Sequence, residues 1–337
     1  MNRLEINTSL IVRVALYVAL IVLGVMVYDI VLLLVVSYIL MTALTPVVSR
    51  LEKLQVPRWL ALISLYLAML ILVSFLIGVS LPPLFNQMRA FIERLPVIVW
   101  EFVTSVDFKG VFNNRDVLVY VQNVLQGLST QLSAAPVSIV RFGAGVLSNI
   151  VNLVVILVFT FYLTLEREKV RSVLVNIIPV NNKKRLVKLI DQVDEKLGAW
   201  LRGQLLLMLV IGLMTWTLLT VLRIEYAVPL ALLAGAFEVI PIVGPILALI
   251  PAVIVVFTIS PLKALIVFVA YLAIQQIENN ILVPRIMKRA VGIDPLLVVL
   301  SLMVGSRVAG TLGALLAIPF TAVLLIVYQE IKAIKRT

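Results

Sequence analysis

Cysteine and histidine are both missing from this 337-residue sequence. Without cysteine the chain can form no disulfide, no thiolate nucleophile and no cysteine-ligated metal site. Without histidine it has no Ser-His-Asp triad and no His-Glu-x-x-His zinc site. A Gly-x-x-x-x-Gly-Lys-Ser/Thr phosphate loop is missing too, which excludes ATP-driven pumping by this chain. We therefore expect a protein that is not an enzyme and has no catalytic residues, no cofactor and no metal.

Charged residues are scarce, at 13% of the sequence where soluble domains carry about a quarter. Hydrophobic residues make up 62% of the chain, and its mean hydropathy is +1.15. Apolar runs such as residues 10–28 and 30–48 reach the length of roughly 20 residues that crosses a bilayer. This composition predicts an all-α polytopic membrane protein.

The net charge of +11 could suggest a nucleic-acid partner, but the placement of the charges argues against it. The basic residues stand in short stretches beside apolar runs, where they set the topology and contact anionic lipid headgroups. We therefore expect the lipid bilayer as a partner and no nucleic acid.

Residues 1–81 are expected to form a scaffold of three transmembrane helices. The first two apolar runs are separated by little more than Asp29, which predicts a tight helical hairpin. Basic residues on both flanks place its two ends in the cytoplasm: Arg3, Arg13, Arg50, Lys53 and Arg58. The third span, residues 59–81, is closed by Pro82-Pro83, which predicts the end of that helix.

Two amphipathic insertions frame the fourth span, residues 143–165. Residues 82–142 carry five Lys/Arg against four Asp/Glu, and their near-neutral charge predicts an extracytoplasmic helical segment. Residues 166–202 carry nine Lys/Arg against five Asp/Glu, which predicts a basic, cytoplasmic amphipathic segment. The chain then enters a predicted transport core, residues 203–337.

Two apolar stretches of the core are each broken by proline and glycine. Residues 229–259 are too long for one membrane span and too short for two. The sides of the membrane assigned to the flanking loops require this stretch to begin and end on the outer side. Residues 295–328 are likewise too long for one span and too short for two, and basic residues on both flanks require them to begin and end on the cytoplasmic side. The sequence thus predicts two re-entrant-type helical hairpins forming an inverted repeat, and about eight membrane segments with amphipathic helices on both faces.

Ionisable and polar residues inside these segments are the candidates for binding. Glu238 stands beside the first predicted break, and Arg307 stands in the second hairpin, where the two could meet across a central site. Each also has a plain interpretation, as a helix end facing water or as a loop residue. The full set of candidate substrate- or ion-binding residues is Glu238, Pro241, Gly244, Pro245, Gln275, Glu278, Asn279, Gly305, Arg307 and Gly310.

Three runs of residues resemble the autoinducer-2 exporter family of bacterial inner-membrane proteins. They are residues 237–245 (Phe-Glu-Val-Ile-Pro-Ile-Val-Gly-Pro), 276–285 (Gln-Ile-Glu-Asn-Asn-Ile-Leu-Val-Pro-Arg) and 310–319 (Gly-Thr-Leu-Gly-Ala-Leu-Leu-Ala-Ile-Pro). The resemblance implies export of a small solute, autoinducer-2 among them, by a homo-oligomer, which we take to be a pentamer. Some similar proteins are credited with sodium/proton antiport.

We therefore expect a secondary transporter that exports a small polar solute by alternating access, with a proton or sodium ion as the coupling ion. A sodium (or lithium)/proton antiporter is the alternative, with Glu238 or Glu278 as the titrating carboxylate. A non-transporting membrane scaffold is the alternative from another class. The expected location is the bacterial inner membrane, with several passes and both termini in the cytoplasm.

Overall fold

The computed structural model describes residues 8–105, 151–177, 183–224, 226–241, 243–257, 259–287 and 294–334. Within these ranges every regular element is helical, and there is no strand. The elements are α1 (Thr8–Lys53), α2 (Arg58–Ser105), the helix Val151–Leu165, α5 (Arg167–Ile177), α6 (Lys183–Val221), α7 (Ala227–Phe237), α8 (Val243–Phe257), α9 (Pro261–Ile277), a π-helical turn (Glu278–Leu282), α10 (Val283–Ile286) and α11 (Pro295–Ile334). The residues 106–150 of the predicted outer segment and fourth span lie outside the described ranges.

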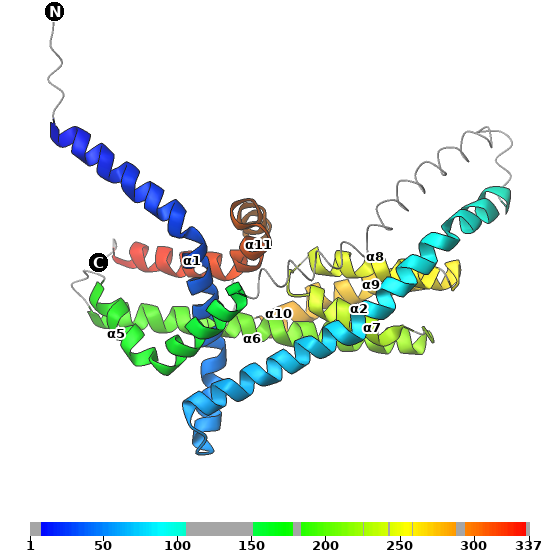
Figure 1. Cartoon of the computed structure of the whole chain (residues 1–337), viewed down its shortest axis with the longest axis horizontal. Helices are drawn as coiled ribbons and strands as arrows, with labels where there is room; N and C mark the ends of the chain where they lie inside the picture. The colour runs from blue at the N-terminus through cyan, green and yellow to red at the C-terminus, as the bar shows by residue number, and fades with distance from the viewer. Residues whose placement is uncertain are drawn as a thin grey trace, which may run out of the picture.

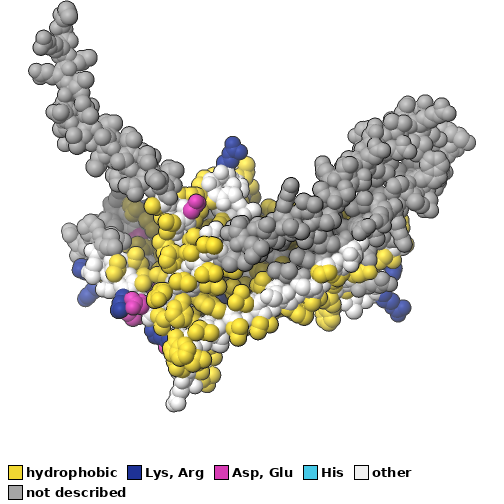
Figure 2. Space-filling view, in the orientation of Figure 1, with side chains coloured by type: hydrophobic (Ala, Val, Ile, Leu, Met, Phe, Trp, Pro, Cys, Tyr) yellow, Lys and Arg dark blue, Asp and Glu magenta, His cyan; other side chains and the backbone are white. Residues whose placement is uncertain are grey.

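Five helices of the described chain are long and apolar enough to cross a bilayer. They are Val27–Lys53, Arg58–Ser80, Lys183–Val221, Pro261–Ile286 and Leu296–Lys332, and three shorter apolar helices accompany them. Large apolar side chains stay exposed along these helices, and Figure 2 shows hydrophobic side chains spread over the visible face with the charged ones near its margins. Since water does not favour such a surface, these features establish a polytopic membrane protein. The count of eight segments stays a prediction.

The N-terminal scaffold differs from its prediction at two places. The hairpin predicted at Asp29 is wrong, because α1 continues through Asp29 as one 46-residue helix. The stop predicted at Pro82-Pro83 is wrong as well, because the 48 residues of α2 run through both prolines. One exposed polar residue does not break a helix that has apolar neighbours on both sides, and membrane helices tolerate proline. The cytoplasmic placement of the N-terminus rested on that hairpin and stays a prediction.

α6 is the element against which most of the others pack. It contacts α1, α5, α7, α9, α10 and α11, and Figure 1 shows it running through the molecule with α1 crossing it and α7 beside it. The domain boundary predicted between residues 202 and 203 falls inside this single 39-residue helix. Its contact with α7 is close because a Cβ on Gly235 would lie 2.7 Å from the Met208 carbonyl oxygen. Small residues at such crossings let two backbones approach each other.

The first broken segment is a pair of short helices, as its spacing predicts. α7 and α8 pack against each other and are joined by a turn over residues 238–241. Gly244, in the first turn of α8, has its backbone against the end of α7. A Cβ there would lie 1.9 Å from the Phe237 carbonyl oxygen, so only glycine fits. Pro245 follows in the first helical turn, where a missing N–H is tolerated.

The second broken segment lies within α11. Its helical geometry is interrupted at Ala309 and Gly310, and Gly310 has φ 59° and ψ −137°, a conformation that favours glycine. Gly305 and Gly313 bring the two arms together, since a Cβ on Gly313 would lie 1.9 Å from the Gly305 carbonyl oxygen. The break near Gly310 is therefore present. The opposite membrane orientation of the two hairpins stays a prediction.

Replacing Gly244 by alanine should destabilise the protein, because the new methyl group meets backbone that cannot rotate away. Overpacking of this kind costs about 1–3 kcal/mol or more. The matched control is Gly78→Ala in α2, where a Cβ meets nothing within 4 Å. Thermal unfolding of the purified proteins in detergent should show a clear loss for Gly244→Ala and no loss for Gly78→Ala. Equal unfolding temperatures would contradict the close approach of α8 to Phe237.

Candidate functional site

Glu238 caps the C-terminal end of α7 at the tip of the first hairpin. Its backbone N–H continues the helix by donating to the Ala234 carbonyl at 3.2 Å. The residue is only 1% exposed, and neither carboxyl oxygen meets an N–H or O–H donor among the described residues. A carboxyl group buried without a donor is costly in a folded protein and therefore needs an explanation.

Glu278 lies opposite Glu238. It is 4% exposed, and its Oε2 accepts a hydrogen bond of 3.0 Å from Nε2 of Gln275. The carboxyl groups of Glu238 and Glu278 are near enough to interact electrostatically with each other. Neither has a donor to offer unless one of them carries a proton. The site therefore joins two carboxyl groups from segments 40 residues apart in sequence.

The backbone around Glu278 is unusual, because α9 passes into a π-helical turn at this residue. Such turns interrupt α-helices frequently at functional sites. Gln275 and Glu278 share one face as their spacing predicts, whereas Asn279 is exposed and separate from them. The turn thus buries one carboxyl group of a polar run whose neighbours Gln276, Asn279 and Asn280 remain exposed.

Gln204 of α6 completes the site, and the sequence analysis missed it. Its side chain is 1% exposed and donates from Nε2 to the backbone carbonyl of Glu238. That carbonyl lies at the C-terminal end of α7, where the last carbonyl groups of a helix have no partner within it. A single glutamine at the start of the apolar run of residues 203–222 was the signal that could have revealed it.

Two facing carboxylates repel each other when both are charged and kept from water. A shared proton or a bound cation relieves that repulsion, as would a cationic side chain. The sequence suggests Arg307 for this role, but the structure does not bring it to Glu238. Arg307 is exposed, and no ion pair involves it among the described residues. The proposed contact between the two hairpin tips is therefore not formed in this structure.

The other candidate residues surround the two breaks rather than the carboxyl pair. Pro241 lies in the turn after Glu238, and Gly244 and Pro245 start α8. Gly305 and Gly310 shape the break in α11. These five residues give the hairpins their form, and no side-chain polar group comes from them.

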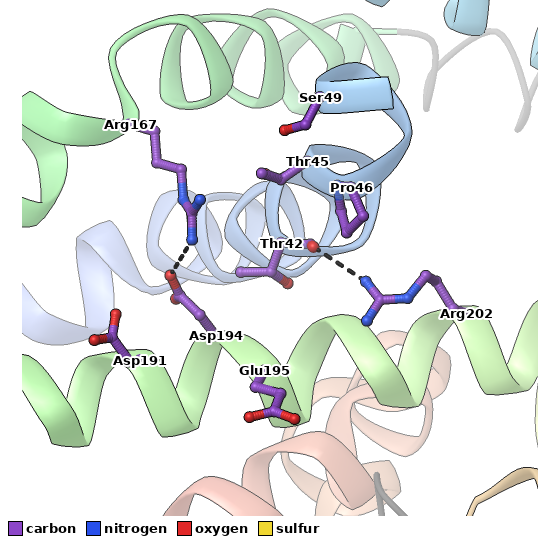
Figure 3. A pocket seen from close by; sticks show the side chains of 9 residues that line it. All are labelled: Thr42, Thr45, Pro46, Ser49, Arg167, Asp191, Asp194, Glu195 and Arg202. Carbon is purple, nitrogen blue, oxygen red and sulfur yellow. Dashed lines mark hydrogen bonds and ion pairs between the residues drawn. The ribbon is translucent and has the colours of Figure 1, made fainter. Parts of the chain in front are cut away.

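A second polar region, which no motif indicated, lies between α1, α5 and α6. It is a pocket of about 370 Å³ lined by Thr42, Thr45, Pro46, Ser49, Arg167, Asp191, Asp194, Glu195 and Arg202 (Figure 3). Proline explains its form. Pro46 has no N–H, so the Thr42 carbonyl of α1 loses its helical partner. Arg202 of α6 donates to that carbonyl at 3.4 Å instead.

The same carbonyl sets the distance between α1 and α6. A Cβ on Gly198 would lie 2.7 Å from the Thr42 oxygen, so glycine is needed at this crossing. Acidic residues on the next turns of α6 pair with α5: Arg167 with Asp194 at 3.1 Å and Arg171 with Asp191 at 2.6 Å. Tyr38 of α1 also donates its hydroxyl to Asp194. α5 and α1 are thereby both held to α6.

Comparison with known proteins places this architecture among transporters. The family model of the AI-2E family transporters matches residues 10–333. The chain is 29% identical to the putative transport protein YueF of Bacillus subtilis over 296 residues, which covers 82% of this chain and 78% of YueF. It is 27% identical to the AI-2 transport protein TqsA of Escherichia coli over 300 residues, covering 85% of this chain and 82% of TqsA. With nearly its whole length matched and a polytopic helical structure, the chain belongs to the AI-2E transporter family.

Proposed function

We propose that this protein is an ion-coupled secondary transporter that exports a small polar solute, with Glu238 and Glu278 as the site of the coupling ion. The observation that carries this proposal is the meeting of two buried carboxyl groups to which no cationic side chain of the described residues is paired. A proton or a sodium ion satisfies both groups, and its release leaves them in repulsion. Binding and release of one cation therefore changes the stability of the hairpin tip.

The position of Glu238 suggests how cation binding at the carboxyl pair is coupled to movement of the solute. Glu238 lies in the turn between α7 and α8, and its carbonyl is held to α6 by Gln204. Neutralising the carboxyl pair removes the main electrostatic penalty for closing the tip against α6 and α9. We propose that the tip moves against the scaffold between two access states, and that the second broken helix, α11, moves in the same cycle.

The solute is proposed to be small and polar, with the autoinducer-2 signal as one candidate because a relative is named an AI-2 transport protein. We place the protein in the inner membrane of a bacterium, in keeping with the bacterial relatives, and as a homo-oligomer whose copies cover part of the exposed apolar surface. ATP is not required, since the sequence has no phosphate loop.

The same carboxyl pair also favours sodium (or lithium)/proton antiport as a second candidate. In that case the pair exchanges one cation for another and no organic solute is involved. The two candidates differ in whether solute flux and cation flux depend on each other, which a reconstituted system can measure.

Replacing Glu238 by glutamine should abolish ion-coupled transport. The amide cannot release a proton or hold a cation as a carboxylate does, so we expect at least a tenfold loss of flux. The measurement uses proteoliposomes loaded with a pH-sensitive dye, and it follows proton movement after addition of sodium, lithium or autoinducer-2. Glu278→Gln should give the same loss, because both variants remove one member of a single pair.

The matched control for this experiment is Glu166→Gln, which removes a carboxylate whose side chain is 51% exposed. Its flux should equal that of the unaltered protein. Proton movement driven by sodium or lithium alone, without autoinducer-2, selects the antiporter. Undiminished flux in both Glu238→Gln and Glu278→Gln would refute the assigned ion site, and no flux under any condition would favour a scaffold.

The Glu238→Gln protein should also be more heat-stable than the unaltered protein above neutral pH. A neutral amide ends the repulsion and can donate to Glu278, and a hydrogen bond to a charged group contributes roughly 1.5–3 kcal/mol. Thermal unfolding in detergent should show a rise of a few degrees that shrinks as the pH falls, because a protonated Glu238 already donates. A variant that unfolds at a lower temperature throughout would show that the carboxylate stabilises the fold.

A further inference from the structure

The polar pocket between α1, α5 and α6 has charges that the protein itself does not neutralise. Two of its acids are already paired: Asp194 with Arg167, and Asp191 with Arg171 from outside the pocket. Glu195 and Arg202 have no oppositely charged partner among the described residues. The pocket therefore presents one free carboxylate and one free guanidinium.

Arg202 is poorly satisfied for a half-buried arginine. Among the described residues its guanidinium donates only to the Thr42 backbone carbonyl, at 3.4 Å, which is longer than the usual range of about 2.7–3.2 Å. A guanidinium carries five N–H donors in a planar fork that suits a carboxylate or another oxyanion. Figure 3 shows this group reaching across the pocket toward Thr42. It is positioned to bind an anionic group that enters the pocket.

The separation of the two free charges indicates the size of the ligand. Glu195 and Arg202 are seven residues apart on α6, but the Arg202 guanidinium reaches back over Gly198, where a Cβ would lie 2.8 Å from its Nη1. Gly198 is three residues from Glu195, about 4.5 Å along the helix axis, so a short ligand spans the two groups. Hydroxyl groups of Thr42, Thr45 and Ser49 line the wall that α1 provides. The Thr42 and Thr45 hydroxyls donate to carbonyls of their own helix, so their oxygens remain free to accept. A cavity of about 370 Å³ lies within the range of small-molecule sites.

We propose that this pocket binds a small zwitterionic solute, with its anionic end at Arg202 and its cationic end at Glu195. The hydroxyl-bearing wall of α1 accepts hydrogen bonds from the polar middle of the ligand. This site is separate from the carboxyl pair at Glu238 and Glu278, and the proposal does not depend on the transport function.

The test uses the full-length protein in detergent and small charged probes, of which γ-aminobutyrate, butyrate and butylammonium share four carbons. Glycine, γ-aminobutyrate and 6-aminohexanoate are zwitterions of increasing length, while butyrate and butylammonium each carry one of the two charges. Binding is measured by isothermal titration calorimetry and by the shift of the unfolding temperature. We expect heat and stabilisation with the zwitterions, and at least tenfold weaker binding of butyrate and butylammonium.

Two variants then assign the ends of the ligand. Arg202→Gln and Glu195→Gln should each weaken the binding of 6-aminohexanoate at least tenfold. We expect both to keep the fold, because Glu195 is exposed and Arg202 is half-buried with one long hydrogen bond. Glu166→Gln is the control and should bind as the unaltered protein does.

Three results would overturn the proposal. They are binding of no zwitterion, binding of butyrate as tight as that of 6-aminohexanoate, and unchanged zwitterion binding in both variants. None of these results bears on the flux measured for Glu238→Gln, so failure here is distinct from failure of the transport proposal.

Discussion

A backbone group inside a bilayer has no water to bond to, and each break in a helix must therefore find its partner within the protein. Two backbone carbonyl groups in this protein find their partners on α6. The Thr42 carbonyl, freed by Pro46, accepts from Arg202, and the Glu238 carbonyl, at the end of α7, accepts from Gln204. These two donors are two residues apart on one helix. The position of α6 thus determines both the polar pocket and the carboxyl pair.

Glycine makes this arrangement sterically possible. Gly198 lets the Thr42 carbonyl approach α6, Gly235 lets α7 approach Met208, and Gly244 closes α8 against Phe237. A methyl group at any of these three positions would meet a backbone oxygen at less than 3 Å. The polar contacts of both sites depend on these short backbone distances, because Gln204 and Arg202 reach carbonyl groups and not flexible side chains.

The parts of this structure that follow from local pattern were predictable from the sequence. Proline and glycine spacing located the breaks near Pro241 and Gly310, and lone polar residues in apolar runs drew attention to Glu238 and Glu278. Asp29 and Pro82-Pro83 misled for a shared reason: in a membrane helix a single polar residue or a proline is tolerated without ending the helix. Such a residue can end a helix or leave it continuous, and the local sequence alone does not distinguish the two.

Contacts between segments far apart in the chain could not be predicted from the sequence. The predicted repeat suggested that Arg307 meets Glu238, but position in a repeat does not determine which side chains meet in space. Glu278, in the π-helical turn after α9, is the residue that interacts with Glu238. The pocket was missed because it joins Thr42 to Arg202, which are 160 residues apart. No motif marks a cavity whose walls come from separate helices.

The 39 residues of α6 form one uninterrupted helix, and this continuity has a mechanical consequence. At a rise of 1.5 Å per residue, Arg202 and Gln204 are about 3 Å apart along the axis of a stiff rod. They cannot be displaced independently of each other. Any translation or rotation of α6 that lengthens its contact with the Thr42 carbonyl of α1 also changes its contact with the Glu238 carbonyl at the tip of α7. The polar pocket and the carboxyl pair therefore change together when α6 moves.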